Sequence, residues 1–349
     1  MRLFGRNGGE SGPRSRRTAE IAKFWEWWSR ARPELDGLVV AGENDELAER
    51  IEAAVATVHP SLVWEIAPGR SAEQALVVTA AGDPELRSLA HRWSLAAPQP
   101  DERWEFHPAR QANPAAAELS IDVGGYEFDF DKLTLGLHVP RGKPRVDVTA
   151  YHPIFTLLEE ETRLSATLLA LDWLLGEDDV ARWIGEIQPA AFQPIDAVAA
   201  VHLPSVVADV ASEFAEEQWA LMEGQTADGA KLVATVRYPL RPVDYPVFDR
   251  HVAIGLGYAH RDDDGMPDGD SVPALRDFEE RLAAGLKPEA AVLVAHISSD
   301  GQRVIHIYAD PEGDAERHIE ELAATWREGD VEVEAEDDPA WAEVSPFLA

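Results

Sequence analysis

The stretch AVLVAHISSDGQRVIHIYA, residues 291–309, decides the fold of the C-terminal part of the chain. It contains two short runs rich in apolar residues, at 291–297 and 304–308. Between them, Ser298-Ser299-Asp300-Gly301 is typical of a tight turn. The pattern predicts a β-hairpin.

Amphipathic helices flank this hairpin. Residues 273–286 before it and 313–326 after it place apolar side chains at helical spacing. A further strand is expected at 331–335, and two more at 232–238 and 251–258. The order β-β-α-β-β-α-β predicts an antiparallel sheet with helices on one face, a ferredoxin-like C-terminal unit.

The N-terminal part repeats helix, strand, strand, helix, strand. The corresponding segments are 44–58, 62–66, 75–79, 84–95 and 104–106. The apolar stripe of 84–95, including its final Trp, has the same spacing as that of 313–326, which predicts a structural duplication. The expected fold class is therefore α+β, with two related antiparallel sheets, each covered by helices.

Composition shifts and prolines suggest how the chain divides. Residues 1–17 carry five Arg and one Glu and are expected to form a disordered basic arm. The expected parts that follow are an N-terminal α+β domain at 18–190, a linker at 191–205 and a C-terminal α+β domain at 206–349.

The charge balance excludes several classes of partner. The 349 residues include 31 Lys and Arg but 64 Asp and Glu, so the formal net charge is −33. Such a chain repels phosphate backbones and anionic lipids, so neither nucleic acid nor membrane is an expected partner of its acidic body. There is no Cys, which excludes thiolate zinc sites and Cys nucleophiles and suits a cytoplasmic location. No cofactor is expected.

Two expected strands carry a carboxylate at every second position. Their acidic residues are Glu127, Asp129 and Asp131 in one and Glu332, Glu334 and Glu336 in the other. Side chains alternate between the faces of a strand, so each row lies on one face. Such a row either keeps a solvated edge from aggregating or binds a basic protein.

An aromatic cluster, Phe24-Trp25-Glu26-Trp27-Trp28, lies in a helix expected at 18–31 that ends before Pro33. Trp27 falls outside the main apolar stripe of this helix. It serves either in packing or, if exposed, in binding a partner.

The sequence contains no recognised nucleotide loop, nucleophile elbow or zinc helix. Clustered acids at 262–270 suggest calcium, but an EF-hand is excluded because His260 and Ser271 occupy its first and twelfth ligand positions. His296 and His306 are expected on adjacent strands, and two histidines alone do not make a metal site. No catalytic and no metal-binding residue is therefore predicted.

Several short motifs resemble one family. They are Phe24-Trp25-x-Trp27, Val78-Thr79-Ala80-Ala81-Gly82, Ala97-Pro98, Trp104-Glu105-Phe106, Leu171-Asp172, Leu175-Gly176-Glu177, Asp179-Val180, Gly265-Met266-Pro267, Gly301-x-Arg303, Ile307-Tyr308 and Asp338-Pro339-x-Trp341. Together they resemble the domain of unknown function 695 family with its companion N-terminal region. The resemblance implies a bacterial cytosolic protein and no established activity. The C-terminal element order is also similar to small acidic regulators of ribonucleases.

Three functions remain open from the sequence. The first is a non-catalytic interaction or regulatory protein that binds a basic protein such as a nuclease or toxin. The second is a metal-dependent hydrolase with a site between the domains, which would gather groups such as His251, His296 and Asp262. The third is a self-associating structural protein.

Overall fold

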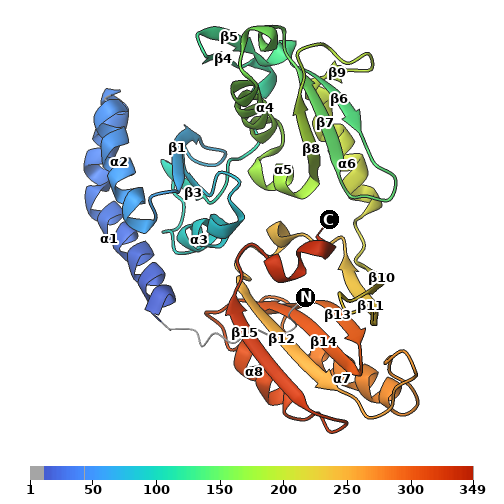
Figure 1. The fold of residues 1–349 in the computed structure, drawn as a ribbon. Helices are drawn as coiled ribbons and strands as arrows, with labels where there is room; N and C mark the ends of the chain where they lie inside the picture. The colour runs from blue at the N-terminus through green and yellow to red at the C-terminus, as the bar shows by residue number, and fades with distance from the viewer. Residues whose placement is uncertain (1–11, 43, 349) are drawn as a thin grey trace. The chain divides into compact units, whose positions relative to one another are not determined.

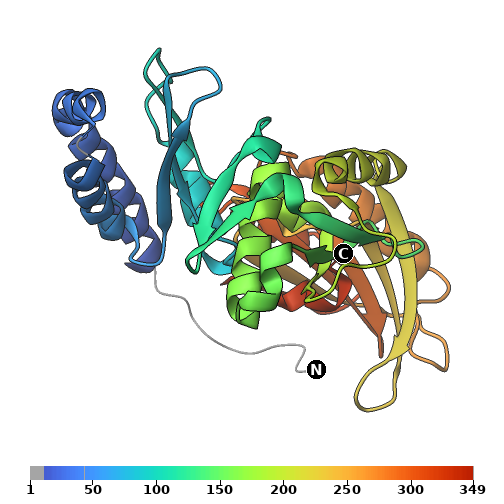
Figure 2. The same ribbon diagram turned by 90° about the horizontal axis from the view of Figure 1, so that it is seen from above.

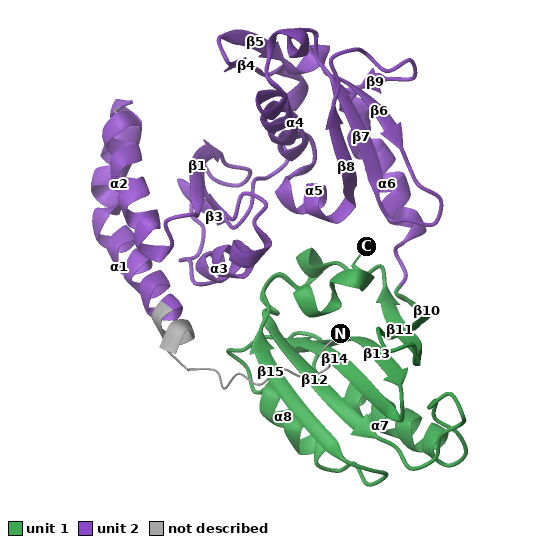
Figure 3. Cartoon of the chain, viewed as in Figure 1, with its two compact units in different colours: residues 1–11, 217–349 green, residues 12–216 purple. Residues whose placement is uncertain are grey.

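The computed structural model describes residues 12–42 and 44–348. They form two compact units, an N-terminal unit of residues 12–216 and a C-terminal unit that begins at Glu217 (Figure 3). The residues 1–11 of the predicted basic arm lie outside the described residues, and the rest of that arm belongs to the first helix. The α+β class is confirmed in both units.

The C-terminal unit is one six-stranded sheet with helices (Figure 1). Its elements are β10 (Gln218–Gln225), β11 (Lys231–Tyr238), η5 (Pro242–Asp244), β12 (Arg250–Gly257), α7 (Ser271–Gly285), β13 (Ala291–Ser299), β14 (Gln302–Ala309), α8 (Ala315–Ala323), β15 (Val331–Asp337) and η6 (Ala342–Phe347). The strand order is β10-β11-β13-β14-β12-β15, and every neighbouring pair is antiparallel. From β12 to β15 the order is ferredoxin-like, as predicted, and β10 adds a strand at the far edge.

The sheet buries both of its faces. On one face, Leu275 and Phe278 of α7 and Ile319 of α8 pack against Ile305 and its neighbours. On the other face, none of the described residues form a long helix: Trp341 just before η6, Val344 within η6, and Phe248 cover Tyr308 and Val292. The C-terminal turn of 3₁₀-helix therefore closes the core that the two helices leave open.

The first part of the N-terminal unit is a helical hairpin beside a small sheet. Its elements are α1 (Gly12–Ala41), α2 (Asn44–Val58), β1 (Val63–Pro68), β2 (Gln74–Thr79), α3 (Pro84–Leu95) and β3 (Trp104–His107). Helices α1 and α2 lie side by side (Figure 2). Contrary to the prediction, α1 does not end before Pro33 but continues through it to Ala41, because Leu35 extends the buried face.

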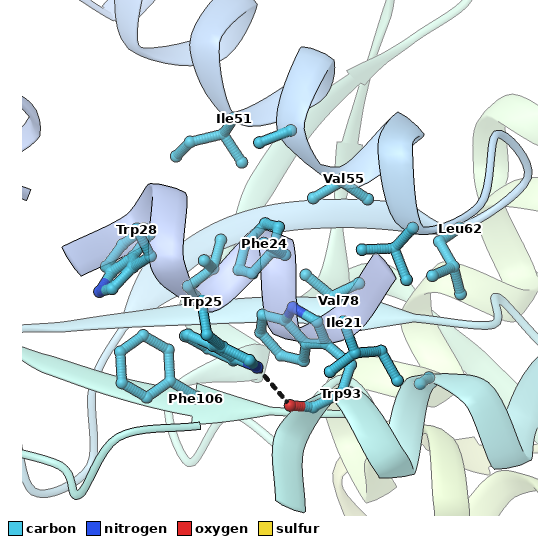
Figure 4. Packing of buried hydrophobic residues seen from close by; sticks show 14 of the residues in the cluster. Ile21, Phe24, Trp25, Trp28, Ile51, Val55, Leu62, Val78, Trp93 and Phe106 are labelled. Atoms are coloured by element: carbon cyan, nitrogen blue, oxygen red, sulfur yellow. Dashed lines mark hydrogen bonds between the residues drawn. The ribbon is translucent and has the colours of Figure 1, made fainter. Parts of the chain in front are cut away.

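Aromatic side chains fill the core of this part. Trp28 of α1, Trp93 of α3 and Trp104 of β3 are at most 1% exposed. The indole N–H of Trp25 donates to the Trp93 carbonyl at 2.9 Å (Figure 4). The edge-to-face and stacked contacts among these rings explain why the first helix carries so many aromatics.

The predicted duplication is present in order, with one difference in pairing. β1 and β2 form an antiparallel hairpin, and β3 pairs directly with β2 in parallel, so this sheet is mixed rather than antiparallel as expected. In the C-terminal unit the equivalent strands β14 and β15 also run parallel, but β12 lies between them. In the C-terminal copy of the repeat, β12 is therefore inserted between the strands that correspond to β2 and β3.

The second part of the N-terminal unit contains two more sheets. Its elements are η1 (Ala116–Glu118), β4 (Ser120–Val123), β5 (Tyr126–Asp129), η2 (Phe130–Lys132), β6 (Thr134–His138), β7 (Val146–Tyr151), η3 (Pro153–Leu157), α4 (Glu160–Leu175), α5 (Glu177–Trp183), β8 (Ile184–Pro189), β9 (Val198–Ala199), η4 (Ala200–His202) and α6 (Leu203–Glu213). β4 and β5 form a hairpin, and the other sheet has the order β8-β7-β6-β9.

The division between the units lies later than predicted. The predicted linker 191–205 contains β9, which pairs with β6, and Ala200 and Leu203, which are buried in the same core as α4. Helix α6 follows and buries Val207 in that core. The apolar content of this segment therefore joins it to the N-terminal unit.

Candidate functional site

Strand β15 forms one edge of the C-terminal sheet and carries Glu332, Glu334 and Glu336, here named the β15 acidic row. The intervening Val333 and Ala335 pack against the core beneath α7 and α8. Since side chains alternate along a strand, the three glutamates share the opposite face of the sheet. Glu332 and Glu336 are exposed, and Glu334 is half-buried.

The neighbouring strand supplies no charge to neutralise this row. In β12, Glu332 lies opposite Gly255 and Glu334 lies opposite Ala253, so neither position opposite these carboxylates holds a basic side chain. In the part of the chain that the structure describes, no basic side chain forms an ion pair with either glutamate. At the end of the row, the Glu336 carboxylate lies 3.9 Å from Nδ1 of His251.

The C-terminal η6 brings a fourth carboxylate, Glu343, to the same place. Burial first, and then Glu332, Glu336 and Glu343, raise the pKa of Glu334 above its ordinary value. The pKa of Glu343 is raised in the same way by burial and by Glu336. The carboxylates thus destabilise one another's charge, and a cation placed between them would relieve this repulsion.

A buried polar network lies beside the row and fixes η6 to the sheet. The Tyr308 hydroxyl donates to Oδ2 of Asp338 at 2.5 Å, and Asp338 also accepts from the backbone N–H groups of Ala342 and Glu343. The indole of Trp341 stacks on Tyr308 with ring centroids 3.8 Å apart. These contacts place Glu343 beside the row.

Two histidines, His251 of β12 and His306 of β14, lie next to this network, with the His251 ring beside that of Tyr308. Nε2 of His251 and Nδ1 of His306 are 3.0 Å apart, and one of them carries the shared proton. Burial lowers the pKa of His251 to about 4 and, together with the neighbouring His251, that of His306 to about 3. Burial and the Asp338 carboxylate raise the pKa of Tyr308. At neutral pH all three rings are therefore uncharged.

The other predicted acidic row is broken by the structure. Strand β5 ends at Asp129, so Asp131 lies in η2 and does not continue the alternation. Lys132 forms an ion pair with Asp129 and lowers its pKa, and the Ser120 hydroxyl donates to Glu127. Trp27, the remaining predicted binding residue, packs against the N-terminal core, with its ring centroid 5.5 Å from that of Phe24.

The groups suggested for a hydrolase site do not come together within the C-terminal unit. His296 faces Glu279 of α7, on the helix side of the sheet, whereas His306 is on the η6 side. The Asp262 carboxylate accepts from the backbone N–H groups of Asp264 and Met266, so it stabilises its own turn. Among the described residues, no three His, Asp or Glu side chains are grouped to hold a metal ion.

A second charged cluster joins the two parts of the N-terminal unit, and the sequence did not indicate it. Arg110 binds Glu65 at 2.9 Å and Asp172 at 3.1 Å, and its backbone N–H donates to Glu177. Two acids share the guanidinium, and the third binds the backbone of the same residue. Burial, followed by the charge of Glu177, raises the pKa of Asp172 to about 6. Several of the resemblance motifs meet here, since Thr79 and Gly82 also donate to Glu177.

Comparison with known proteins agrees with the resemblance for one unit. Residues 218–349, from the start of β10, match the "Family of unknown function (DUF695)", which confirms the resemblance over the C-terminal part of the chain. No curated protein and no solved structure matches the chain. No helix in the described ranges combines the length and apolarity that crossing a bilayer requires.

Proposed function

We propose that this chain is a non-catalytic interaction or regulatory protein that binds a basic protein through the β15 acidic row. One observation carries the proposal: three glutamates are aligned on an outer strand, and no described cation pairs with Glu332 or Glu334. Surface carboxylates that only aid solubility have no need of this alignment. A cytoplasmic location forms part of the proposal.

The charge of the whole chain supports this role. A net charge of −33 draws basic proteins toward the surface and raises their association rate, particularly at low ionic strength. The local row would then select a site for docking. Protection of the edge from aggregation is the alternative explanation of the row, and it predicts no partner.

The chemistry around the row favours binding over catalysis. His251 and His306 are at most 6% exposed, and Tyr308 is fully buried. Each already has a hydrogen-bond partner within the network, and their lowered or raised pKa values keep them uncharged at neutral pH. A general acid or base needs both access and a pKa near the working pH.

Affinity capture with three immobilised proteins tests the proposal. They are the wild type, the row variant Glu332→Gln/Glu334→Gln/Glu336→Gln, and the control variant Glu102→Gln/Glu186→Gln/Glu223→Gln, whose acids are exposed and scattered along the chain. At low salt, the wild type and the control should retain the same basic protein from a lysate, and the row variant should not. High salt should release it. Capture of nothing at low salt, or equal capture by the row variant, contradicts the proposal.

Self-association is a second candidate, because the opposite edge of the sheet is apolar. In β10, Trp219 is 46% exposed and Leu221 is 68% exposed. An edge strand with exposed apolar side chains and a single charged residue pairs readily with another strand. Sizing chromatography of the wild type and of Leu221→Lys tests this function: a dimer that the substitution dissociates supports it, and a monomeric wild type contradicts it.

A further inference from the structure

The outer edge of β15 is open from Val331 to Glu336. β15 is the last strand of the sheet, and among the described residues it pairs with β12 alone. No backbone hydrogen bond outside this ladder involves residues 331–336 in the described part of the chain. In an antiparallel edge strand, about half of the backbone N–H and C=O groups point away from the sheet, where they can pair with a further strand.

The side chains of β15 leave this edge accessible. Val333 and Ala335 turn toward the helix-covered core, and the glutamates project from the other face. Gly255 and Ala253, which lie opposite Glu332 and Glu334, are small and add no bulk beside these two residues. β15 therefore offers both backbone groups and a regular row of charges to one ligand.

We infer that the partner adds to this edge as a seventh strand, with Lys or Arg at alternate positions facing Glu332, Glu334 and Glu336. This inference rests on the proposed function and specifies how the row is recognised. β-Strand addition obtains affinity from main-chain hydrogen bonds and specificity from alternate side chains. The same backbone register that completes the ladder brings each cation opposite one carboxylate.

The spacing of the row matches a strand. Every second residue of an extended chain advances by about 6.8 Å, so successive glutamates and successive alternate partner residues share one repeat. One metal ion cannot serve such a row, because its oxygen ligands must all lie about 2.0–2.6 Å from it. Opposite charges directly across neighbouring strands are stabilising, whereas the row by itself brings only like charges together.

The two edges of the sheet also differ in a way that favours β15 for this ligand. β10 carries Trp219 and Leu221 on its exposed face and a single acid, Glu223, so it offers a basic strand little charge. A ligand chosen by alternating cations should therefore bind at β15 and be insensitive to β10.

Synthetic peptides and the intact protein test this inference. The probe is a nine-residue peptide, Thr-Lys-Val-Lys-Val-Lys-Val-Lys-Thr, and its comparison is a peptide of the same composition with all lysines in one block. Two further versions carry N-methyl groups, at every lysine in one and at every valine in the other. Because alternate N–H groups of a strand point to opposite edges, only one of these methylated sets should face β15.

Titration at low ionic strength should rank the peptides. The alternating peptide should bind about tenfold more tightly than the blocked one, a difference of about 1.4 kcal/mol. One N-methylated peptide should lose about tenfold in affinity, and the other should bind like the parent. The row variant should also bind the alternating peptide about tenfold more weakly than the wild type, because it loses three exposed ion pairs. The control variant Glu102→Gln/Glu186→Gln/Glu223→Gln should keep the wild-type affinity.

The outcomes separate this inference from the proposed function. If both methylated peptides bind like the parent while the row variant loses affinity, strand addition is wrong and the acidic row still binds cations. If no peptide binds at low salt, or the row variant binds as tightly as the wild type, both ideas are wrong.

Discussion

Substituting Asp172 with asparagine should stabilise the N-terminal unit at neutral pH. Asp172 is 8% exposed and shares the Arg110 guanidinium with Glu65, while Glu177 accepts from the Arg110 backbone N–H. Its pKa of about 6 lies above the value of about 3.9 for an unfolded chain, so the folded state binds the proton more tightly. The contribution of this group to stability is therefore greatest below about pH 4 and is lost as the pH rises through about 6.

The size of the effect follows from that shift. Two pKa units correspond to about 3 kcal/mol of unfavourable free energy in the ionised folded state at pH 7. The asparagine side chain, like a protonated aspartate, avoids most of this cost, because the pKa shift already includes the attraction between the carboxylate and Arg110. We expect a net gain in the free energy of unfolding of about 2–3 kcal/mol at pH 7.5 and of no more than about 1 kcal/mol at pH 4.5, where the folded aspartate is already protonated.

Urea denaturation of the full chain at both pH values measures this difference. The control Asp209→Asn changes an exposed aspartate of α6 and should leave the free energy of unfolding within about 0.5 kcal/mol at either pH. A loss of stability in Asp172→Asn at pH 7.5, or a gain that is equal at pH 4.5, refutes the reasoning.

Three further predictions concern the C-terminal unit. NMR titration should show the rings of His251 and His306 neutral down to about pH 5, and protonation of either ring above pH 6 would contradict the buried pair. Between about pH 6.5 and 4 only the unfolded chain binds these protons, so the free energy of unfolding should fall as the pH falls through that window. Trp341→Ala should cost about 3–5 kcal/mol in urea unfolding, because the ring is 1% exposed, and a cost below about 1 kcal/mol contradicts its role in holding η6. Gly265→Ala should lower the free energy of unfolding more than Gly229→Ala does. Both glycines have a positive φ, but of the two only Gly265 lies so close to other backbone that an added Cβ would be 2.9 Å from the Asp300 Cα. Equal free energies of unfolding for the two variants would show that this contact costs nothing.

Local sequence patterns predicted the C-terminal unit well because the apolar residues of each helix or strand follow a single spacing. The apolar runs at 291–297 and 304–308 became β13 and β14, joined through Gly301, whose φ of 79° suits glycine. The alternation at 331–336 correctly separated the core-facing residues from the glutamates. What alternation cannot give is the position of a strand in the sheet, so the edge location of β15 comes from the structure alone.

Other features depend on contacts between residues far apart in sequence. Pro33 is a local helix breaker, yet the burial of Leu35 outweighs it and α1 continues. Glu343 joins the acidic row only because Asp338 and Trp341 fold η6 over the sheet. The motif Asp338-Pro339-x-Trp341 lies at the start of that turn, but nothing in it indicates that a carboxylate would lie beside β15.

The most direct test of docking at β15 is the dissociation constant of the alternating-lysine peptide for the row variant relative to that for the control variant, measured at low ionic strength. Both variants lose three negative charges, so a general attraction to the acidic body weakens equally in each. We predict about tenfold weaker binding to Glu332→Gln/Glu334→Gln/Glu336→Gln alone. Equal dissociation constants for the two variants would contradict recognition by the β15 acidic row.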